Sequence, residues 1–313
     1  MNALIFPGQG SQTVGMASEF YNKFDLVKKI FLKADKRLGY SISDIILNGP
    51  EDKLQLTKNT QPAILTVSYS IFKVLKQEFG FNFKNFKYFA GHSLGEYSAL
   101  VCAEALNFED AIYLLHERGK AMQEAVPIGE GSMLAVLGLD INKINELLLS
   151  FKGETGVCEI ANDNANGQII LSGNKKNIEL VQKNLKEKKI KSILLKVSAP
   201  FHCSLMKPAA ENMEKKISLT KLNKSSYQIV SNVTTKPEND PDIIKKLLID
   251  QIFSTVRWRE SIINMNDLGV NNFIELGPGK VLTSMVKRTV KDANTFSINS
   301  IADMKNMENE FKK

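Results

Sequence analysis

Residues 88–95 read Tyr88-Phe89-Ala90-Gly91-His92-Ser93-Leu94-Gly95, an apolar run followed by a serine between two glycines. The run Tyr88–Ala90 is typical of a buried strand, and helical spacing resumes at Gly95. Flanking glycines let a strand turn sharply into a helix, with the serine at the corner. Backbone N–H groups at a helix N-terminus can stabilise an oxyanion. The stretch predicts Ser93 as a nucleophile; the alternative is a serine that merely caps a helix.

Strands and long helices alternate on both sides of this turn, which predicts a parallel sheet wrapped by helices, an α/β-hydrolase-like domain. In the second helix, Thr60 is expected to be the cap and Pro62 to lie in the first turn. The charged tail after Asp303 is expected to fray. The predicted strands, besides the one before Ser93, are Leu4–Phe6, Gln228–Val233 and Phe273–Leu276; the predicted helices are Met16–Gly39, Gln61–Phe79, Gly95–Leu106, Phe108–Glu124, Ile243–Phe253 and Val281–Val290.

Between residues 127 and 197 the pattern changes to β-α-β-β-α-β, which is the order of a ferredoxin-like unit. We therefore predict a small inserted domain at 127–197 and a discontinuous catalytic domain made of 1–126 and 198–313. The polar stretch Asn162–Gly167 is expected to be a turn. The predicted elements of the insert are strands at Ser132–Leu139, Val157–Ala161, Gln168–Ser172 and Ile190–Val197, and helices at Ile141–Phe151 and Asn174–Lys188.

The composition excludes several classes of protein. The 313 residues are 43% hydrophobic, enough for a substantial core, yet no apolar run reaches the roughly 18 residues of a membrane span. The N-terminus does not resemble a secretory signal, and three cysteines are too few and too scattered for a disulfide framework or a zinc site. We expect a cytoplasmic monomer that binds no metal.

The net charge of +7 is moderate, and no nucleic-acid-binding module accompanies it. Lysines are densest from Lys175 to Lys196. Such a run is ordinarily a solvated helix face. The sharper interpretation is a surface that attracts an acidic partner and speeds association.

A serine hydroxyl needs a base, and the chain has three histidines. His92 is adjacent to Ser93, so its side chain is expected to diverge and to shape the site. His116 lies in a helical pattern, where an ordinary surface or half-buried histidine is the commoner outcome. His202 follows the insert in a loop, where the chain re-enters the catalytic domain. We therefore predict His202 as the base. No acid stands out as a third member, and a backbone carbonyl can also orient an imidazole.

Four blocks, in this order, resemble the bacterial malonyl-CoA:acyl carrier protein transacylase family. The resemblance runs from Phe6 to about Arg288. The blocks are Phe6-Pro7-Gly8-Gln9-Gly10-Ser11-Gln12, Gly91-His92-Ser93-Leu94-Gly95-Glu96, Ala199-Pro200-Phe201-His202 and Glu275-Leu276-Gly277-Pro278-Gly279-Lys280.

The resemblance implies a two-step exchange. Ser93 attacks the thioester of malonyl-CoA while His202 takes its proton, and the phosphopantetheine thiol of acyl carrier protein then attacks the malonyl-serine ester. It also implies that the backbone N–H groups of Gln9 and Leu94 form the oxyanion hole. The main-chain carbonyl of Gln251 would orient the histidine. No cofactor is implied, because malonyl-CoA is a substrate and the partner carries the phosphopantetheine.

Two further positions follow from the same resemblance. Arg118 would pair with the malonyl carboxylate, since a planar guanidinium grips a carboxylate through two charge-assisted hydrogen bonds. The alternative from sequence alone is a surface salt bridge with Glu117 or Glu124. Gln61 falls on a position that lines the family's pocket.

Phe201 departs from many stand-alone bacterial members, which carry serine there. Malonyl-selective acyltransferase domains of polyketide synthases often carry phenylalanine at this place. A bulky ring beside the α-carbon would exclude a methyl branch, which is worth about 1–3 kcal/mol. Simple packing is the other interpretation. We expect malonyl to be preferred over methylmalonyl.

Three alternatives stay open at this point. A serine esterase or thioesterase would share the turn at Ser93 but would have no use for Arg118. A polyketide pathway would use the same transfer reaction. A non-catalytic docking module for acyl carrier protein would not need Ser93, His202 and Arg118 together.

Overall fold

The strand that leads into Ser93 lies inside a six-stranded sheet with the order β10-β9-β1-β2-β7-β8, here called the large sheet. The structure is a computed structural model and describes residues 1–151 and 156–311. The strands from β10 to β7 are parallel, and β8 is antiparallel to β7. Their bounds are β1 Asn2–Phe6, β2 Phe86–Gly91, β7 Gln228–Val230, β8 Pro237–Glu238, β9 Asn272–Leu276 and β10 Asn294–Ile298.

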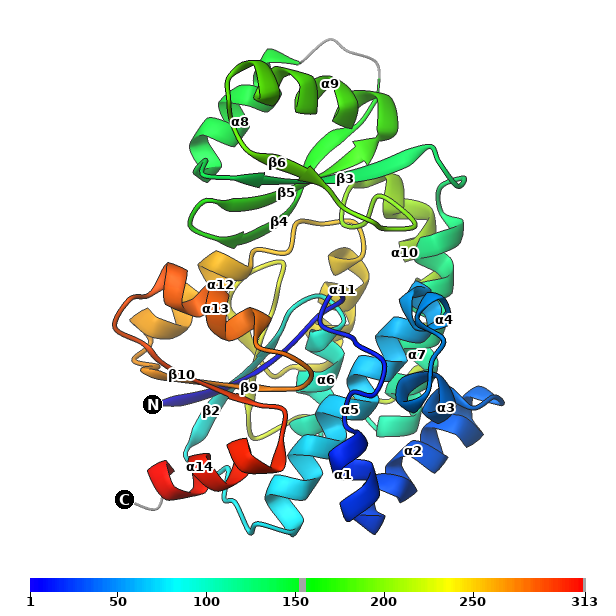
Figure 1. Ribbon diagram of the computed structural model, residues 1–313, viewed down its shortest axis with the longest axis vertical. Helices are drawn as coiled ribbons and strands as arrows, with labels where there is room; N and C mark the ends of the chain where they lie inside the picture. Colours follow the sequence, from blue (N-terminus) through cyan, green and yellow to red (C-terminus); the bar gives the residue numbers. More distant parts are fainter. Residues whose placement is uncertain (152–155, 312–313) are drawn as a thin grey trace.

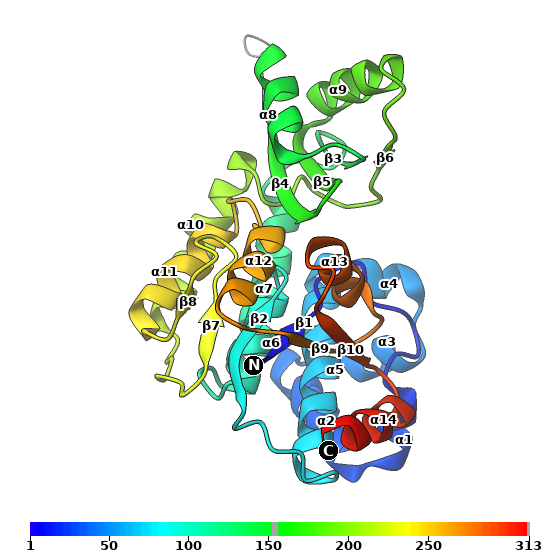
Figure 2. The same cartoon turned by 90° about the vertical axis from the view of Figure 1, so that its left-hand side faces the viewer.

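Helices cover both faces of the large sheet (Figures 1 and 2). Alternate residues of a strand point to opposite faces. Leu4 and Phe6 of β1 therefore join the core under α5 and α6, whereas Ala3 and Ile5 pack against α12 and α13. The helices of this part are α1 Ser18–Lys23, α2 Asp25–Leu38, α3 Ile42–Leu47, α4 Glu51–Gln55, α5 Thr57–Gln77, α6 Gly95–Cys102, α7 Phe108–Glu124, α10 Lys207–Leu219, α11 Pro241–Gln251, α12 Trp258–Asp267, α13 Val281–Thr289 and α14 Ile301–Phe311.

A second, four-stranded antiparallel sheet lies above the large one in Figure 1 and is here called the small sheet. Its strand order is β4-β5-β3-β6, and α8 and α9 cover the face that points away from the large sheet. Leu134 and Val136 of β3 pack under these helices, whereas Met133 and Ala135 face the large sheet. The elements are β3 Gly131–Leu137, α8 Ile141–Ser150, β4 Cys158–Ala165, β5 Gln168–Asn174, α9 Lys175–Glu187 and β6 Ser192–Leu194.

The parallel sheet, the alternation of strands and helices, and the β-α-β-β-α-β order between residues 131 and 194 agree with the sequence prediction. The bounds of α7 match it at both ends. At its start, the Asn107 side chain accepts from the N–H groups of Glu109 and Asp110 and caps the helix. Within the described residues, every helix is too short or too polar to traverse a lipid bilayer.

The start of α5 differs from the prediction. The helix begins at Thr57 rather than after Thr60, so Thr60 is not its cap and Pro62 lies beyond the first turn. Proline has no N–H for the carbonyl four residues earlier, which is that of Lys58. His116 Nδ1 lies 3.1 Å from this carbonyl oxygen. His116 on α7 thus supplies the hydrogen-bond donor that Pro62 lacks. Because His116 is distant in sequence, the residue pattern around α5 does not reveal this contact.

Other predicted elements were wrong in extent. The Met16–Gly39 helix is broken at Phe24, and the Gly95–Leu106 helix ends at Cys102. The polar stretch Asn162–Ala165 continues strand β4 instead of forming a turn, because its side chains are buried against other parts of the chain. The tail forms α14 as far as Phe311, with Met304 and Met307 buried, while 312–313 lie outside the described residues. Helices α3, α4, α10 and α12 were not predicted.

A close helix contact between α5 and α7 brings two candidate site residues together. A Cβ atom at Gly119 would lie 2.6 Å from both Lys58 Cα and Thr57 O, so this position has no room for a side chain. The neighbouring Arg118 therefore reaches Gln61 of α5, and its Nη1 donates to Gln61 Oε1 at 2.9 Å.

Candidate active site

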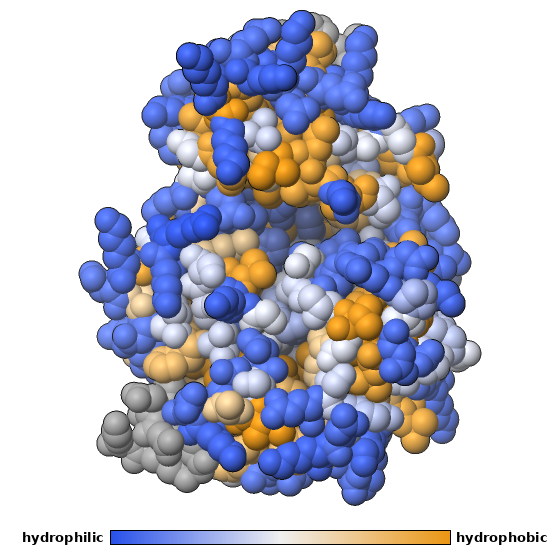
Figure 3. Space-filling view, viewed as in Figure 1, coloured by the Kyte–Doolittle hydropathy of each residue, from blue (hydrophilic) through white to orange (hydrophobic). Residues whose placement is uncertain are grey.

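A cleft of about 370 Å³ lies between the two sheets. Figure 3 shows it as a hollow, with apolar surface above it on the small sheet. The loops that follow β1 and β2 supply its polar floor, because the carboxyl ends of parallel strands meet at the same edge of a sheet. Met133, Ala135 and Ile170 of the small sheet supply an apolar roof.

The turn at Ser93 has the tight geometry that the two glycines predict. A Cβ at Gly91 would lie 1.9 Å from the carbonyl atoms of Gly95, and one at Gly95 would lie 2.2 Å from Phe6 O. Ser93 has φ of 53°, in the left-handed region that is costly for a residue with a side chain. The surroundings must therefore hold this backbone in place.

Ser93 and His202 are in hydrogen-bond contact. Ser93 Oγ lies 2.8 Å from His202 Nε2, and His202 Nδ1 lies 2.9 Å from the main-chain oxygen of Gln251. A carbonyl oxygen only accepts, so Nδ1 carries the proton and Nε2 presents its lone pair to the serine hydroxyl. His202 also has positive φ, 59°.

The electrostatic surroundings keep this imidazole neutral. Burial, reinforced by the positive charge of Arg118, lowers the pKa of His202 to about 3. At neutral pH the ring is therefore unprotonated, with the Nε2 lone pair facing Ser93 Oγ.

Arg118 lies in the same cavity and is only 1% exposed. Its Nη2 donates to Ser93 Oγ at 3.1 Å and to Gln251 Oε1 at 2.9 Å. Glu117 pairs instead with Lys216, so the surface salt bridge with Glu117 does not form. In the described part of the chain, no carboxylate lies within ion-pair distance of Arg118, and its Nε has no hydrogen-bond partner. Burial lowers the pKa of Arg118.

The remaining predicted residues also line the cleft. Gln9, Leu94, Gln61 and Phe201 all contribute to its wall. Among the described residues, the backbone N–H groups of Gln9 and Leu94 have no intramolecular hydrogen-bond partner. They are therefore available to a ligand oxygen.

Three polar residues that the sequence analysis did not assign to the site lie against the turn. Asn232 Oδ1 accepts from Ser93 N at 2.7 Å, and Glu96 accepts from Asn232 N at 3.0 Å. Asn164 Oδ1 lies 2.8 Å from His92 Nε2 and connects the turn to the small sheet. Asn232 lies two residues after the end of β7, so its place at the carboxyl edge of a parallel sheet was the signal that could have indicated it. Within the described residues, no group of three or more His, Cys, Asp or Glu side chains is placed to hold a metal ion.

Comparison with known proteins gives the class and then the family. The chain matches the acyl transferase domain family over residues 3–312, which places it among the acyl transferases. It is 42% identical to the malonyl CoA-acyl carrier protein transacylase of Bacillus subtilis (strain 168) over 297 residues, 95% of this chain and 92% of the relative. The chain belongs to the malonyl CoA-acyl carrier protein transacylase family.

Solved structures agree with this family assignment. The acyl-carrier-protein-S-malonyltransferase of Bartonella henselae superposes with a TM-score of 0.96 at 40% identity, covering 100% of this chain and 99% of that one. A type II PKS acyl-carrier protein in complex with its malonyl-transacylase matches with a TM-score of 0.94 at 37% identity, covering 99% of each chain.

The buried Glu96 carboxyl predicts a pH-dependent stability. Burial raises its pKa to about 7 from 4.5, so the folded protein holds this proton more tightly than the unfolded chain. The resulting stabilisation is full below about pH 4.5 and is lost as the pH rises through about 7. The Glu96→Gln variant cannot ionise. Between pH 5 and pH 8 the unsubstituted protein should therefore lose up to about 3 kcal/mol of unfolding free energy through Glu96, and the variant should not.

Urea unfolding of both proteins at the two pH values measures this difference. Glu187→Gln, at an exposed position on α9, is the matched control and should follow the unsubstituted protein. A Glu96→Gln curve that also follows it would contradict the burial argument.

Proposed function

We propose that this protein transfers the malonyl group of malonyl-CoA to the phosphopantetheine thiol of acyl carrier protein, in supply of fatty-acid synthesis. The supporting observation is that one atom, Ser93 Oγ, lies within hydrogen-bond distance of both His202 Nε2 and Arg118 Nη2. A nucleophile, a base and a carboxylate anchor then share one cavity. The names of the relatives agree with this activity.

In the first step, Ser93 Oγ attacks the thioester carbonyl while its proton passes to His202 Nε2. The negative charge that forms on the carbonyl oxygen is stabilised by the N–H groups of Gln9 and Leu94. The carbon–sulfur bond then breaks, and the proton on His202 leaves with the thiol of coenzyme A. Malonyl-Ser93 remains.

In the second step, the thiol of acyl carrier protein gives its proton to His202 and attacks the ester carbonyl. The carbon–oxygen bond to Ser93 breaks, and the proton returns to Ser93 Oγ. The exchange is ping-pong. It needs no cofactor, because each step only converts a thioester into an oxygen ester or the reverse. The Gln251 carbonyl keeps Nδ1 protonated throughout, which fits a dyad without an acid.

Arg118 is the carboxylate anchor of this proposal. The carboxylate of a malonyl group is two bonds from the carbonyl carbon that Ser93 attacks, so its partner must lie beside the nucleophile. Arg118 does so, and its buried guanidinium has no carboxylate partner in the described chain. A substrate carboxylate would supply the missing counter-charge. An ordinary esterase or thioesterase has no use for such a cation.

Phe201 is the proposed selectivity residue. It is buried beside His202 and lines the cleft, where a methyl branch on the α-carbon would meet its ring. We therefore expect malonyl to be preferred over methylmalonyl.

The two domains proposed from the sequence are consistent with this mechanism. Residues 1–126 and 198–313 would form an α/β-hydrolase-like catalytic domain, and 127–197 a ferredoxin-like domain that roofs the cleft. We propose that the protein acts as a monomer, in which one chain supplies all the residues named for the site. The three free cysteines fit a reducing, cytoplasmic location.

A polyketide pathway is the second candidate for the destination of the malonyl group. The observation that favours it is the match to the solved complex of a type II PKS acyl-carrier protein with its malonyl-transacylase. Both candidates use the same chemistry and the same residues.

The test of the proposed function is the intact mass of the protein after mixing with malonyl-CoA. One malonyl group should appear on the unsubstituted protein and should leave when acyl carrier protein is added. Ser93→Ala should stay unmodified. Absence of any malonyl adduct, or rapid release of free malonate instead of transfer, would rule the proposal out.

Arg118→Ala should change acyl selectivity. Two charge-assisted hydrogen bonds to the carboxylate would be lost, which corresponds to a fall of about 100- to 10,000-fold in kcat/KM for malonyl-CoA. Acetyl-CoA has no carboxylate and should be affected much less. Single-turnover acylation with the two thioesters measures the ratio. Equal losses would show that Arg118 serves the fold alone.

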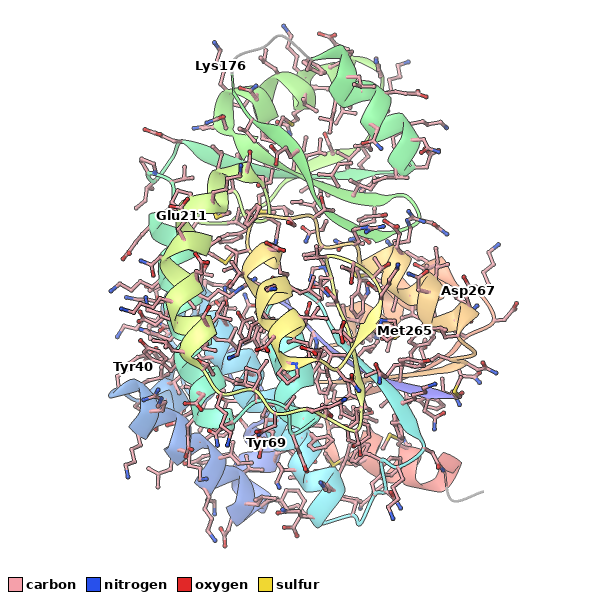
Figure 4. The ribbon with its side chains drawn as sticks, turned by 180° about the vertical axis from the view of Figure 1, so that it is seen from behind. Tyr40, Tyr69, Lys176, Glu211, Met265 and Asp267 are labelled. Carbon is pink, nitrogen blue, oxygen red and sulfur yellow. The ribbon has the colours of Figure 1, made fainter. Side chains whose placement is uncertain are left out.

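We propose the lysine-rich segment Lys175–Lys196 as the docking surface for the acidic carrier protein. Lys183, Lys186, Lys189 and Lys191 line one open groove of about 600 Å³. Strand β6 leads from this groove to the cleft, which is lined by the following residues, Leu195 to Val197. In Figure 4, Lys176 lies at the top of the molecule, on the helical side of the small sheet.

Charge reversal at Lys186 and Lys189 tests this surface. The Lys186→Glu/Lys189→Glu variant should raise the KM for carrier protein about 10-fold and leave the KM for malonyl-CoA unchanged. The control, Lys29→Glu/Lys36→Glu, makes the same charge change on α2 at the opposite end of the molecule. Equal KM values for carrier protein in the two variants would exclude the lysine groove.

A further inference from the structure

Beneath the turn at Ser93 lies a set of three buried polar side chains that the exchange mechanism does not use. They are Glu96 on α6, Asn232 after β7 and Gln251 at the end of α11, and each is at most 1% exposed. Residues this polar are rarely buried so completely unless their hydrogen bonds are satisfied.

The Gln251 side chain connects the anchor to the nucleophile. Its Oε1 accepts from Arg118 Nη2 at 2.9 Å, and its Nε2 donates to Ser93 O at 3.1 Å. A guanidinium only donates, so the amide oxygen must face Arg118 and the amide nitrogen must face the turn. The orientation of this amide is therefore fixed by chemistry.

Asn232 holds the turn from its other side. Its Oδ1 accepts from Ser93 N at 2.7 Å and its Nδ2 donates to Gly91 O at 2.8 Å. The two bonds clamp the backbone on each side of His92, where the chain enters its strained conformation.

Glu96 joins these two residues. Its Oε2 accepts from Gln251 Nε2 at 2.8 Å and from Asn232 N at 3.0 Å. One carboxyl oxygen thus supports the amide that orients Arg118 and the loop that clamps Ser93. The charged and titratable groups that act on Glu96 here are Arg118 and the Tyr97 hydroxyl.

We propose that Glu96 is a positioning residue, which holds the carboxylate anchor and the nucleophile in one fixed relation through Gln251 and Asn232. The inference rests on the proposed function and adds a determinant of malonyl selectivity that does not touch the substrate. Its physical basis is that a strained turn and an unpaired guanidinium each need partners that do not move.

The consequence concerns selectivity as well as rate. Without the Glu96 acceptor, Gln251 can turn its amide and Arg118 is no longer fixed at the place of the malonyl carboxylate. Acylation by malonyl-CoA should therefore suffer more than acylation by acetyl-CoA. A loss of stability alone would reduce both reactions by the same factor.

The experiment compares Glu96→Ala and Glu96→Gln by single-turnover acylation of Ser93 with malonyl-CoA and with acetyl-CoA. Glu96→Ala should lower the malonyl-to-acetyl rate ratio roughly tenfold, the effect of losing hydrogen bonds to a charged group. Glu96→Gln keeps an oxygen acceptor and should retain a ratio within about twofold of the unsubstituted protein.

Glu275→Gln is the matched control. Glu275 is also a buried carboxyl, and it accepts from Leu282 N and Thr283 N at the start of α13, away from Gln251. It should leave the malonyl-to-acetyl ratio unchanged, even where it changes the melting temperature.

The outcomes separate the two proposals. No malonyl on the unsubstituted protein would remove the proposed function. Normal acylation with an unchanged ratio in folded Glu96→Ala, or a ratio that falls equally in Glu96→Gln, would overturn the role of Glu96 alone.

If Glu96→Ala does not fold, Gln251→Met tests the same path, because it removes the amide and keeps the main-chain carbonyl that bonds to His202. It should lower the ratio as well, and an unchanged ratio would overturn the inference.

Discussion

The arrangement of this site depends on the burial of one charge, the guanidinium of Arg118. Moving a cation out of water costs several kcal/mol unless polar groups replace the water. Here the replacements are the amide oxygens of Gln61 and Gln251 and the hydroxyl of Ser93. Each acceptor comes from a different part of the chain. The hydrogen bonds of Arg118, which lies on α7, therefore connect this helix to α5, to α11 and to the turn after β2.

The close approach of α5 and α7 makes this convergence possible. At Gly119 the α5 backbone fills the space of a side chain, and this brings the start of α5 against the middle of α7. On α5, Pro62 leaves a free carbonyl, and His116 on α7 lies within hydrogen-bond distance of it. A glycine, a proline and a histidine that seem unrelated in the sequence thus belong to the same helix contact, and this contact places Arg118 beside Gln61.

Much of this could be predicted from the sequence where the signal is local. The turn at Ser93 carries its own signature in Gly91 and Gly95, and the helix predicted over Phe108–Glu124 has the bounds of α7. The alternation of strands and helices indicated the parallel sheet, because periodicity of apolar residues reports which faces are buried.

Several of the errors share one cause, which is that polar residues were interpreted by local preference. Asn162, Asp163 and Asn164 form part of a strand because Asp163 meets Arg259 at 2.8 Å and Asn164 meets His92. Thr60 is inside a helix because its hydroxyl donates to Leu54 O. Glu96 and Asn232 escaped notice because their partners are distant in sequence, 136 residues apart in one pair.

The charge of Arg118 also acts on His202. Burial and the charge of Arg118 together lower the pKa of His202 and keep its imidazole neutral. On the proposed function, a malonyl carboxylate would cancel much of that charge on binding. The imidazole would then become easier to protonate at the moment when Ser93 must lose its proton. An acyl group without a carboxylate would leave the cation uncompensated, and His202 would stay a weaker base. The anchor would thereby select its substrate twice, once by binding and once through the basicity of the histidine.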